Sequence, residues 1–288
     1  MKIIFTWGFL KNGEIKMNTM LNLVKTEWLK IKGYPAFWWM LGIVALSYPG
    51  INYTFYANGY KDQLTDETMG PILRLLPNPF TFPGCWQTVA FVSSLFVFLP
   101  AIVVIMFITN EYTFKTHRQN VIDGWSRKNF MLSKIIDVAI VCGLITVLYI
   151  IAVMIIGGLN SGMSDIGFTE GAKYTGLFFL QALSQLSIAL LIALLVRRAF
   201  ITLGIFLFYY FPLEPFLVAM SKRHANGIGE YLPLEISDRL IPFPRWFIRD
   251  ENEWKAVVAQ SNVHVWYTLL LLGVTWGICF WVNKKRDL

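Results

Sequence analysis

The sequence of 288 residues predicts an all-α membrane protein with six transmembrane helices. Two features support this prediction: long stretches without charged residues and a high content of hydrophobic residues. Long stretches lack Asp, Glu, Lys and Arg, at residues 33–60, 75–110, 138–164, 174–196, 199–213 and 256–283. A bilayer core needs about 20 apolar residues for each helical crossing, and five of these stretches are long enough by themselves. Hydrophobic residues also make up 56% of the chain, and its mean hydropathy is +0.52. A soluble protein of this size would leave too much apolar surface exposed.

The first 35 residues are expected to precede the membrane domain. Residues 1–18 form an extension for which Met17 and Met20 offer alternative starts, and its apolar run at 3–10 is too short for a secretory signal. Residues 19–35 predict an amphipathic helix on the inner leaflet. Its apolar residues recur at helical spacing, at Leu21, Val24, Trp28 and Ile31.

Residues 36–288 form the predicted membrane domain, with spans at 36–56, 86–109, 135–158, 173–196, 199–219 and 263–282. We expect the fifth span to be broken near its outer end, at Pro212-Leu213-Glu214-Pro215, because proline disturbs a helix. Two long outer segments, 57–85 and 221–262, separate spans. The second is expected to send short helices, at 228–234 and 239–248, back into the outer interface.

The distribution of basic residues predicts that both termini are cytoplasmic, because short cytoplasmic loops hold the excess of Lys and Arg. With that topology, the inner segments carry 16 basic residues against six acidic ones, whereas the outer segments carry more acidic than basic residues. The net charge of +7 therefore indicates a multi-pass protein of the cell's inner (cytoplasmic) membrane and requires no nucleic-acid partner.

The loop between the second and third spans, residues 109–130, is the most specific segment. It predicts a short cytoplasmic helix at about 111–122, a tight turn at Asp123-Gly124, and Ser126 as the N-cap of the third span. A polar helix followed by a rigid reversal is suited to receive a push from a partner and pass it to two spans. An ordinary positively charged inner loop is the plainer alternative.

The same loop reads Asn-Glu-Tyr-x-x-x-Thr-x-Arg-Gln-Asn-x-Ile-Asp-Gly-x-Ser-Arg from Asn110 to Arg127. In this pattern the chain resembles type-2 ABC transporter permeases, and the resemblance extends over the interfacial helix, the six spans and the long outer segment. It implies that the loop is a coupling helix that sits on a separate ABC ATP-binding subunit. It assigns this contact to Glu111, Thr116, Arg118, Gln119, Asn120, Asp123, Gly124, Ser126 and Arg127.

The energy source is expected to lie outside the chain. The span interiors contain none of the acidic, Arg or His residues that ion-coupled transporters use, since Glu111 and Asp137 fall at inner ends and Glu214 near an outer end. The chain also lacks a phosphate-binding Gly-x-x-x-x-Gly-Lys-Ser/Thr loop. No hydrolase motif, metal-ligand spacing or paired Cys-x-x-Cys occurs, so we predict no enzyme activity, no cofactor and no metal.

Polar and aromatic residues inside the spans have two interpretations. Gln181, Ser184 and Gln185 share one helical face, which favours hydrogen bonds between helices over substrate contact. The resemblance implies that spans two and five line the central route, so it points to an apolar pathway at Phe91, Phe96, Phe98, Phe206, Phe208, Tyr209 and Tyr210. Facing lipid is the plainer role for such side chains.

The sequence thus predicts a permease half that works by alternating access. Its expected partners are an ABC ATP-binding subunit, a second permease half, either an identical copy or a paralogue, and membrane lipid. The expected substrate is amphipathic or apolar and is exported from the inner face. A membrane sensor or assembly scaffold that transports nothing is the alternative.

Overall fold

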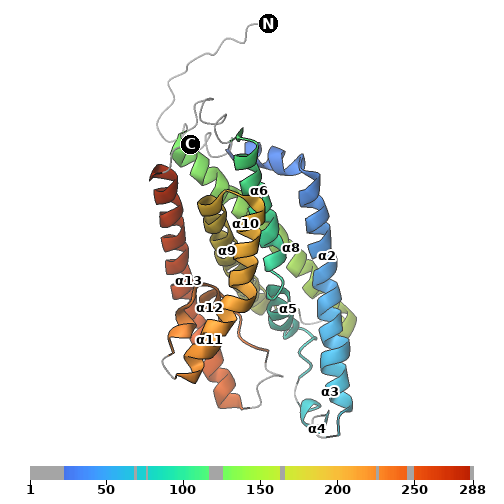
Figure 1. The fold of residues 1–288 in the computed structure, drawn as a ribbon. Helices are drawn as coiled ribbons and strands as arrows, with labels where there is room; N and C mark the ends of the chain where they lie inside the picture. Colours follow the sequence, from blue (N-terminus) through green and yellow to red (C-terminus); the bar gives the residue numbers. More distant parts are fainter. Residues whose placement is uncertain are drawn as a thin grey trace, which may run out of the picture.

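The computed structural model describes residues 23–67, 70–75, 77–116, 126–162, 166–224, 227–244 and 250–285. Every regular element in these ranges is helical, which confirms the all-α prediction. Figure 1 shows the long helices side by side in one bundle. The elements, from the N-terminal side onward, are a helix at 23–32, here called the N-terminal helix, then α2 (Pro35–Thr54), η1 (Phe55–Lys61), α3 (Asp62–Thr65), α4 (Gly70–Leu73), α5 (Cys85–Ser94), α6 (Phe98–Thr113), α8 (Arg127–Ser161), α9 (Phe168–Val196), α10 (Ala199–Phe208), η2 (Tyr209–Leu213), α11 (Glu214–Arg223), η3 (Ile228–Tyr231), α12 (Pro233–Asp238) and α13 (Glu251–Lys285).

Helix α9 forms the centre of the bundle. It packs against α5, α6, α8, α10, α12 and α13, and it is the most enclosed of the apolar helices. Its buried face meets aromatic side chains of the neighbouring helices, where the Phe178 ring stacks on Tyr149 of α8 with ring centroids 4.7 Å apart. Because α9 touches nearly every other long helix, it holds the bundle together.

Four described helices are long and apolar enough to cross a membrane: α8, α9, α10 to α11, and α13. The bent pair of α5 and α6 would make a fifth. Helix α2 covers the predicted first span, but Pro49, Asn52 and its tryptophans lower its hydropathy. The chain therefore has several membrane-type helices, and the total of six spans stays a prediction.

The second predicted span, 86–109, corresponds to two helices, α5 and α6. Residues 95–97 form a turn, and α5 and α6 meet at an angle of 48°. Pro100 is the third residue of α6. Proline has no backbone N–H, and its ring crowds the carbonyl group four residues earlier, which disfavours a regular helix at this point.

The fifth predicted span is bent less than expected. In place of a break at 212–215, the chain makes a π-helical turn, η2, that contains Pro212 and then continues into α11. The wider π turn accommodates a proline while keeping the helix axis. In the outer segment, α12 lies at 233–238, and residues 239–244 are not helical, so the expected helix at 239–248 is wrong in its described part.

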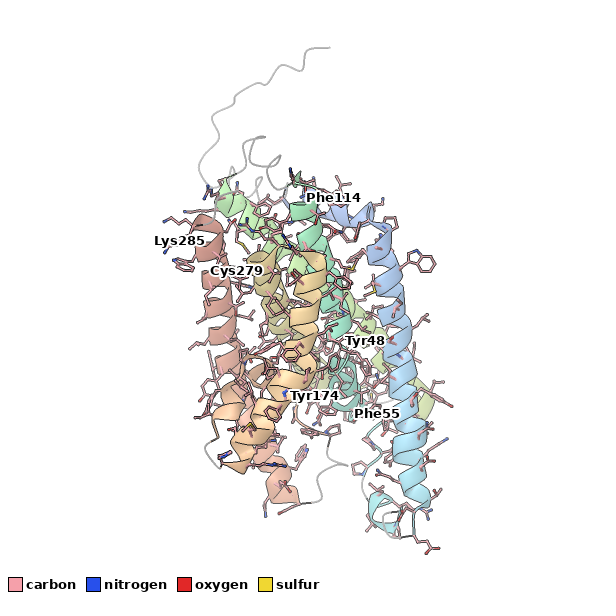
Figure 2. The ribbon with its side chains drawn as sticks, viewed as in Figure 1. Tyr48, Phe55, Phe114, Tyr174, Cys279 and Lys285 are labelled. Carbon is pink, nitrogen blue, oxygen red and sulfur yellow. The ribbon has the colours of Figure 1, made fainter. Side chains whose placement is uncertain are left out.

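The described parts of the predicted inner segments lie together at one end of the bundle, here called the basic end. Figure 1 shows the N-terminal helix, the end of α6 and the start of α8 there, with the end of α13. Figure 2 places the labelled residues Phe114 and Lys285 at this end and Tyr48 near mid-height. The described basic residues of this end are Lys25, Lys30, Lys32, Lys115, Arg127, Lys128, Lys134, Arg197, Arg198, Lys284 and Lys285.

Candidate functional site

A buried cluster of five charged side chains lies at the basic end and is here called the ion cluster. The N-terminal helix contributes Glu27 and Lys30, the last turn of α6 contributes Glu111, and the first turns of α8 contribute Lys134 and Asp137. The cluster therefore joins three elements that are separate in the sequence.

Lys134 occupies the middle of the ion cluster. Its Nζ lies 2.7 Å from Oδ2 of Asp137, 2.8 Å from Oε1 of Glu111 and 3.5 Å from Oε2 of Glu27. The Phe107 and Phe130 rings approach the same ammonium group, with centroids 5.5 and 5.6 Å away. An ammonium group surrounded by three carboxylates and two aromatic faces has its charge compensated from several sides.

Lys30 closes the cluster on the solvent side. Its Nζ lies 2.8 Å from Oε1 of Glu27 and 3.3 Å from Oε1 of Glu111. The Lys134 and Glu27 side chains are fully buried, whereas the Lys30 side chain is 30% exposed. Burial by itself raises the pKa of Glu27, but Lys134 and Lys30 outweigh this effect and hold the pKa below its ordinary value. Glu27 is therefore ionised at neutral pH, although its side chain is fully buried.

The cluster also decides which face of the N-terminal helix meets the bundle. Leu23, Glu27 and Ile31 are buried at intervals of four residues, whereas Val24 and Trp28 are 41% and 39% exposed. Of the expected apolar stripe, Ile31 therefore meets the bundle beside Glu27, and Leu21 lies outside the described residues. Val24 and Trp28 are left facing outward.

The predicted coupling residues fall partly outside the described residues, namely Arg118, Gln119, Asn120, Asp123 and Gly124. Of the others, Glu111 belongs to the ion cluster, and the Thr116 hydroxyl donates to the Glu111 carbonyl oxygen at 3.3 Å. Ser126 is confirmed as the N-cap of α8, because its side chain accepts a hydrogen bond from the backbone N–H of Asn129 at 3.1 Å.

Arg127, on the C-terminal side of this loop, forms hydrogen bonds with the last helix, α13. Its Nη1 donates to the carbonyl oxygen of Lys284 at 2.9 Å, and the Asn283 side chain donates to the Arg127 carbonyl oxygen at 2.8 Å. Arg197, at the junction of α9 and α10, places its guanidinium group 4.9 Å from the centroid of the Tyr112 ring. The two flanks of residues 117–125 are thus connected to α8, α13, the N-terminal helix and the end of α9.

Residues 81–232 match a family model described as a protein of unknown function (DUF2705). The match covers just over half of the chain. The chain belongs to the DUF2705 family. No curated protein matches it.

Several of the predicted pathway residues meet in this DUF2705 protein where α6 begins. The Phe98 ring contacts Phe96 and Tyr210, at centroid distances of 6.1 and 5.8 Å, and Tyr210 contacts Phe206 at 5.8 Å. The break between α5 and α6 and the π turn at η2 therefore lie next to each other.

The other three predicted pathway residues lie elsewhere. Phe91 packs on Phe243 of the outer segment at 4.8 Å. Phe208 is 60% exposed on the outside of α10, and Tyr209 interacts with Glu214. The seven aromatic residues therefore do not line one common pathway in the structure.

The polar side chains of α9 form hydrogen bonds with other helices of the same chain. Gln181 and Gln185 donate hydrogen bonds to the Asp238 carboxylate of α12, and Ser187 accepts one from the Trp276 indole of α13. These contacts agree with the expectation that the α9 glutamines bind other helices.

Sequence reasoning missed the ion cluster, although one signal was present. Lys134 and Asp137 are three residues apart at the start of an apolar helix, a spacing that brings them to one face. A cation at the edge of a long apolar run indicates a buried partner. Glu27 has a local partner in Lys30, but no such signal indicated its contact with Lys134, which lies on a distant helix.

Proposed function

We propose that this chain is the transmembrane subunit of an ATP-driven ABC exporter, with ATP hydrolysed by a separate subunit that docks at the basic end. The observation that carries the proposal is the attachment of residues 117–125. The loop that resembles a coupling helix is flanked on one side by Glu111 and on the other by Arg127, and both residues are bonded to other helices.

The ion cluster supports a mechanical role for this loop. A force applied to residues 117–125 passes through Glu111 to Lys134 and Glu27, because these buried groups cannot separate without leaving a charge unpaired. The N-terminal helix, α6 and α8 would therefore move together as one body. In the proposed mechanism, closure of the ATPase subunits tilts α6 and α8 against a second membrane half and opens the route to the other side.

The exposed side of α10 and α11 leaves an apolar surface on which a second membrane half could pack. Phe200 is 91% exposed, Phe208 60% and Phe216 60%, so an apolar strip runs along these helices. Lipid tails or the second half would cover this strip equally well. A homodimer and a pairing with a paralogue both fit the proposal.

The first test is the association of the two subunits. The full chain should co-purify with an ABC ATP-binding protein from its own cells and change the ATPase rate of that protein. Arg118→Ala or Asp123→Ala should abolish the change while leaving expression and membrane insertion intact. Lys128→Ala is the matched control, since this exposed residue lies in the same region but outside the resembling pattern.

Two results would contradict the proposal. One is an unaltered ATPase response in both the Arg118 and the Asp123 variant, which would remove the loop from the mechanism. The other is a chain that binds no nucleotide-hydrolysing subunit at all. That second result would favour the alternative, a membrane sensor or scaffold, which needs no energy source.

A further inference from the structure

A cavity of about 250 Å³ lies between the π turn η2, α11 and α12, away from the basic end. Its apolar walls come from Tyr210, Pro215, Val218 and Leu234. Its polar lining comes from three carboxylates, at Glu214, Glu235 and Asp238, and one ammonium group, at Lys222. The cavity therefore combines apolar walls with an excess of negative charge.

Asp238 is held so that one of its oxygens stays available. Its Oδ1 accepts hydrogen bonds from Gln181 and Gln185 of α9, at 2.9 and 2.6 Å. No described residue donates to Oδ2, and the residue is open to the cavity. A carboxylate fixed through one oxygen presents the other to an incoming hydrogen-bond donor.

Glu214 is the second carboxylate, and it is only 2% exposed. Its Oε1 accepts from the backbone N–H groups of Leu234 and Glu235, at 2.7 and 2.8 Å, which fixes the start of α12. Its Oε2 is buried and receives no hydrogen bond of standard geometry from the described residues, although the Tyr209 hydroxyl interacts with this carboxylate. A buried carboxyl oxygen in this position needs a hydrogen-bond donor or a cation as its partner.

The remaining charges near the cavity do not satisfy this need. Glu235 is paired with Arg239, whose Nε lies 2.8 Å from Oε1. Lys222 lines the cavity, and within the described residues it forms no ion pair with Glu214 or Asp238. The cavity thus carries two carboxylates that form no ion pair within 4 Å with its one ammonium group.

The size of the cavity distinguishes an organic cation from a metal ion. At about 30 Å³ per water, the volume equals roughly eight water molecules, more than a single bare ion fills. No group of three or more His, Cys, Asp or Glu side chains suited to a metal occurs among the described residues. The Tyr210 ring on the wall also suits an organic cation, which aromatic faces attract.

The backbone at this cavity is unusual in a way that supports a binding role. Tyr210 lies within the π turn η2. Glu214, the first residue of α11, comes directly after the end of this turn. Single π turns inside α-helices are frequent at functional sites, because the extra residue redirects side chains. Here both redirected residues line the same cavity.

We propose that this cavity binds the ammonium or guanidinium end of an amphipathic ligand, with the Asp238 and Glu214 carboxylates as its counter-charge. The further step of taking this ligand as the substrate of the exporter rests on the proposed function. Binding of the cation itself needs no ATPase subunit, so the two proposals can fail separately.

Binding should also depend on pH. Partial desolvation by the surrounding protein atoms is the main reason that the pKa of Asp238 is raised to about 7, although the side chain is open to the cavity; the Glu235 and Glu214 carboxylates add to the rise, and hydrogen bonds from Gln181 and Gln185 oppose it. Only the ionised carboxylate attracts a cation. Affinity should therefore increase as pH rises through about 7 and level off above it.

The experiment measures binding of phenethylammonium to the purified full chain in nanodiscs by isothermal titration calorimetry. The uncharged analogue 2-phenylethanol tests the need for charge. We expect the ammonium compound to bind more tightly, by about 10- to 100-fold, which is the range for a hydrogen bond to a charged group. Equal affinity for the two compounds, or binding of neither, would overturn the inference.

Variants locate the site. Asp238→Asn keeps an oxygen for Gln181 and Gln185, so the fold should persist while affinity for phenethylammonium falls about tenfold and its pH dependence disappears. Lys222→Met should raise affinity, because it removes a like charge. Glu253→Gln, an exposed acid of α13, is the matched control and should change nothing. Unchanged binding in the Asp238 variant would place the ligand elsewhere. Binding without any transport would refute the exporter and leave the cation site intact.

Discussion

Replacing Lys134 with methionine should destabilise the protein strongly, because it removes the cation on which three carboxylates depend. At an effective dielectric constant near 20, contacts of 2.7, 2.8 and 3.5 Å each supply about 5–6 kcal/mol of attraction. Desolvation of the buried ions offsets most of this gain. Removing one partner of a buried ion pair therefore costs a net of about 3–5 kcal/mol.

The assay is thermal unfolding of the purified chain in detergent, followed by tryptophan fluorescence. At roughly 2–4 °C per kcal/mol, the melting temperature of Lys134→Met should fall by about 10 °C. Lys30→Met is the matched control in the same cluster. Because its side chain is 30% exposed, its loss should cost no more than about 1 kcal/mol.

A double variant separates loss of charge from loss of packing. Lys134→Met combined with Asp137→Leu restores the net charge of the ion cluster, so part of the lost stability should return. The reasoning is refuted if Lys134→Met and Lys30→Met melt within 2 °C of each other, a margin of about 1 kcal/mol. It is also refuted if the double variant is less stable than Lys134→Met alone.

Two further predictions concern packing and orientation. Gly157→Ala should destabilise the chain by about 1–3 kcal/mol, because the added Cβ would lie 2.5 Å from the Phe82 ring. The control is Gly143→Ala on the same helix, where the added Cβ meets nothing within 4 Å. This control should be neutral or stabilising in the same thermal melt. Cysteines introduced at Glu253 and Lys285, at the two ends of α13, should differ in labelling by a membrane-impermeant maleimide in intact cells: only the Glu253 position should react. Labelling at Lys285, or at both positions, would contradict the predicted orientation or the crossing itself.

Residue type and spacing along the sequence were enough to predict where several of the long helices lie. Charge-free stretches located α8, α9, α10 to α11 and α13, because a helix in lipid has to be apolar over its whole length. Ser126 was predicted as an N-cap from its place before a helical segment, and this local signal held. The number of crossings and the direction of the chain remain predictions from apolar length and the balance of Lys and Arg.

Tertiary contacts decided what local signals left open. Pro100 indicates a disturbed helix, but the 48° angle between α5 and α6 is a property of the packed bundle. The Glu27 side chain would face water on an isolated amphipathic helix, and it is buried only because Lys134 arrives from α8.

By itself, the sequence determined that this chain is helical and of membrane type, since both properties follow from residue composition along short segments. Only the tertiary structure decided which charges meet. The ion cluster joins residues 27, 111 and 134, and the cavity near α12 joins residues 181, 214 and 238. Electrostatic attraction acts through space at a few ångströms, so partners far apart along the chain become visible only after the helices have packed.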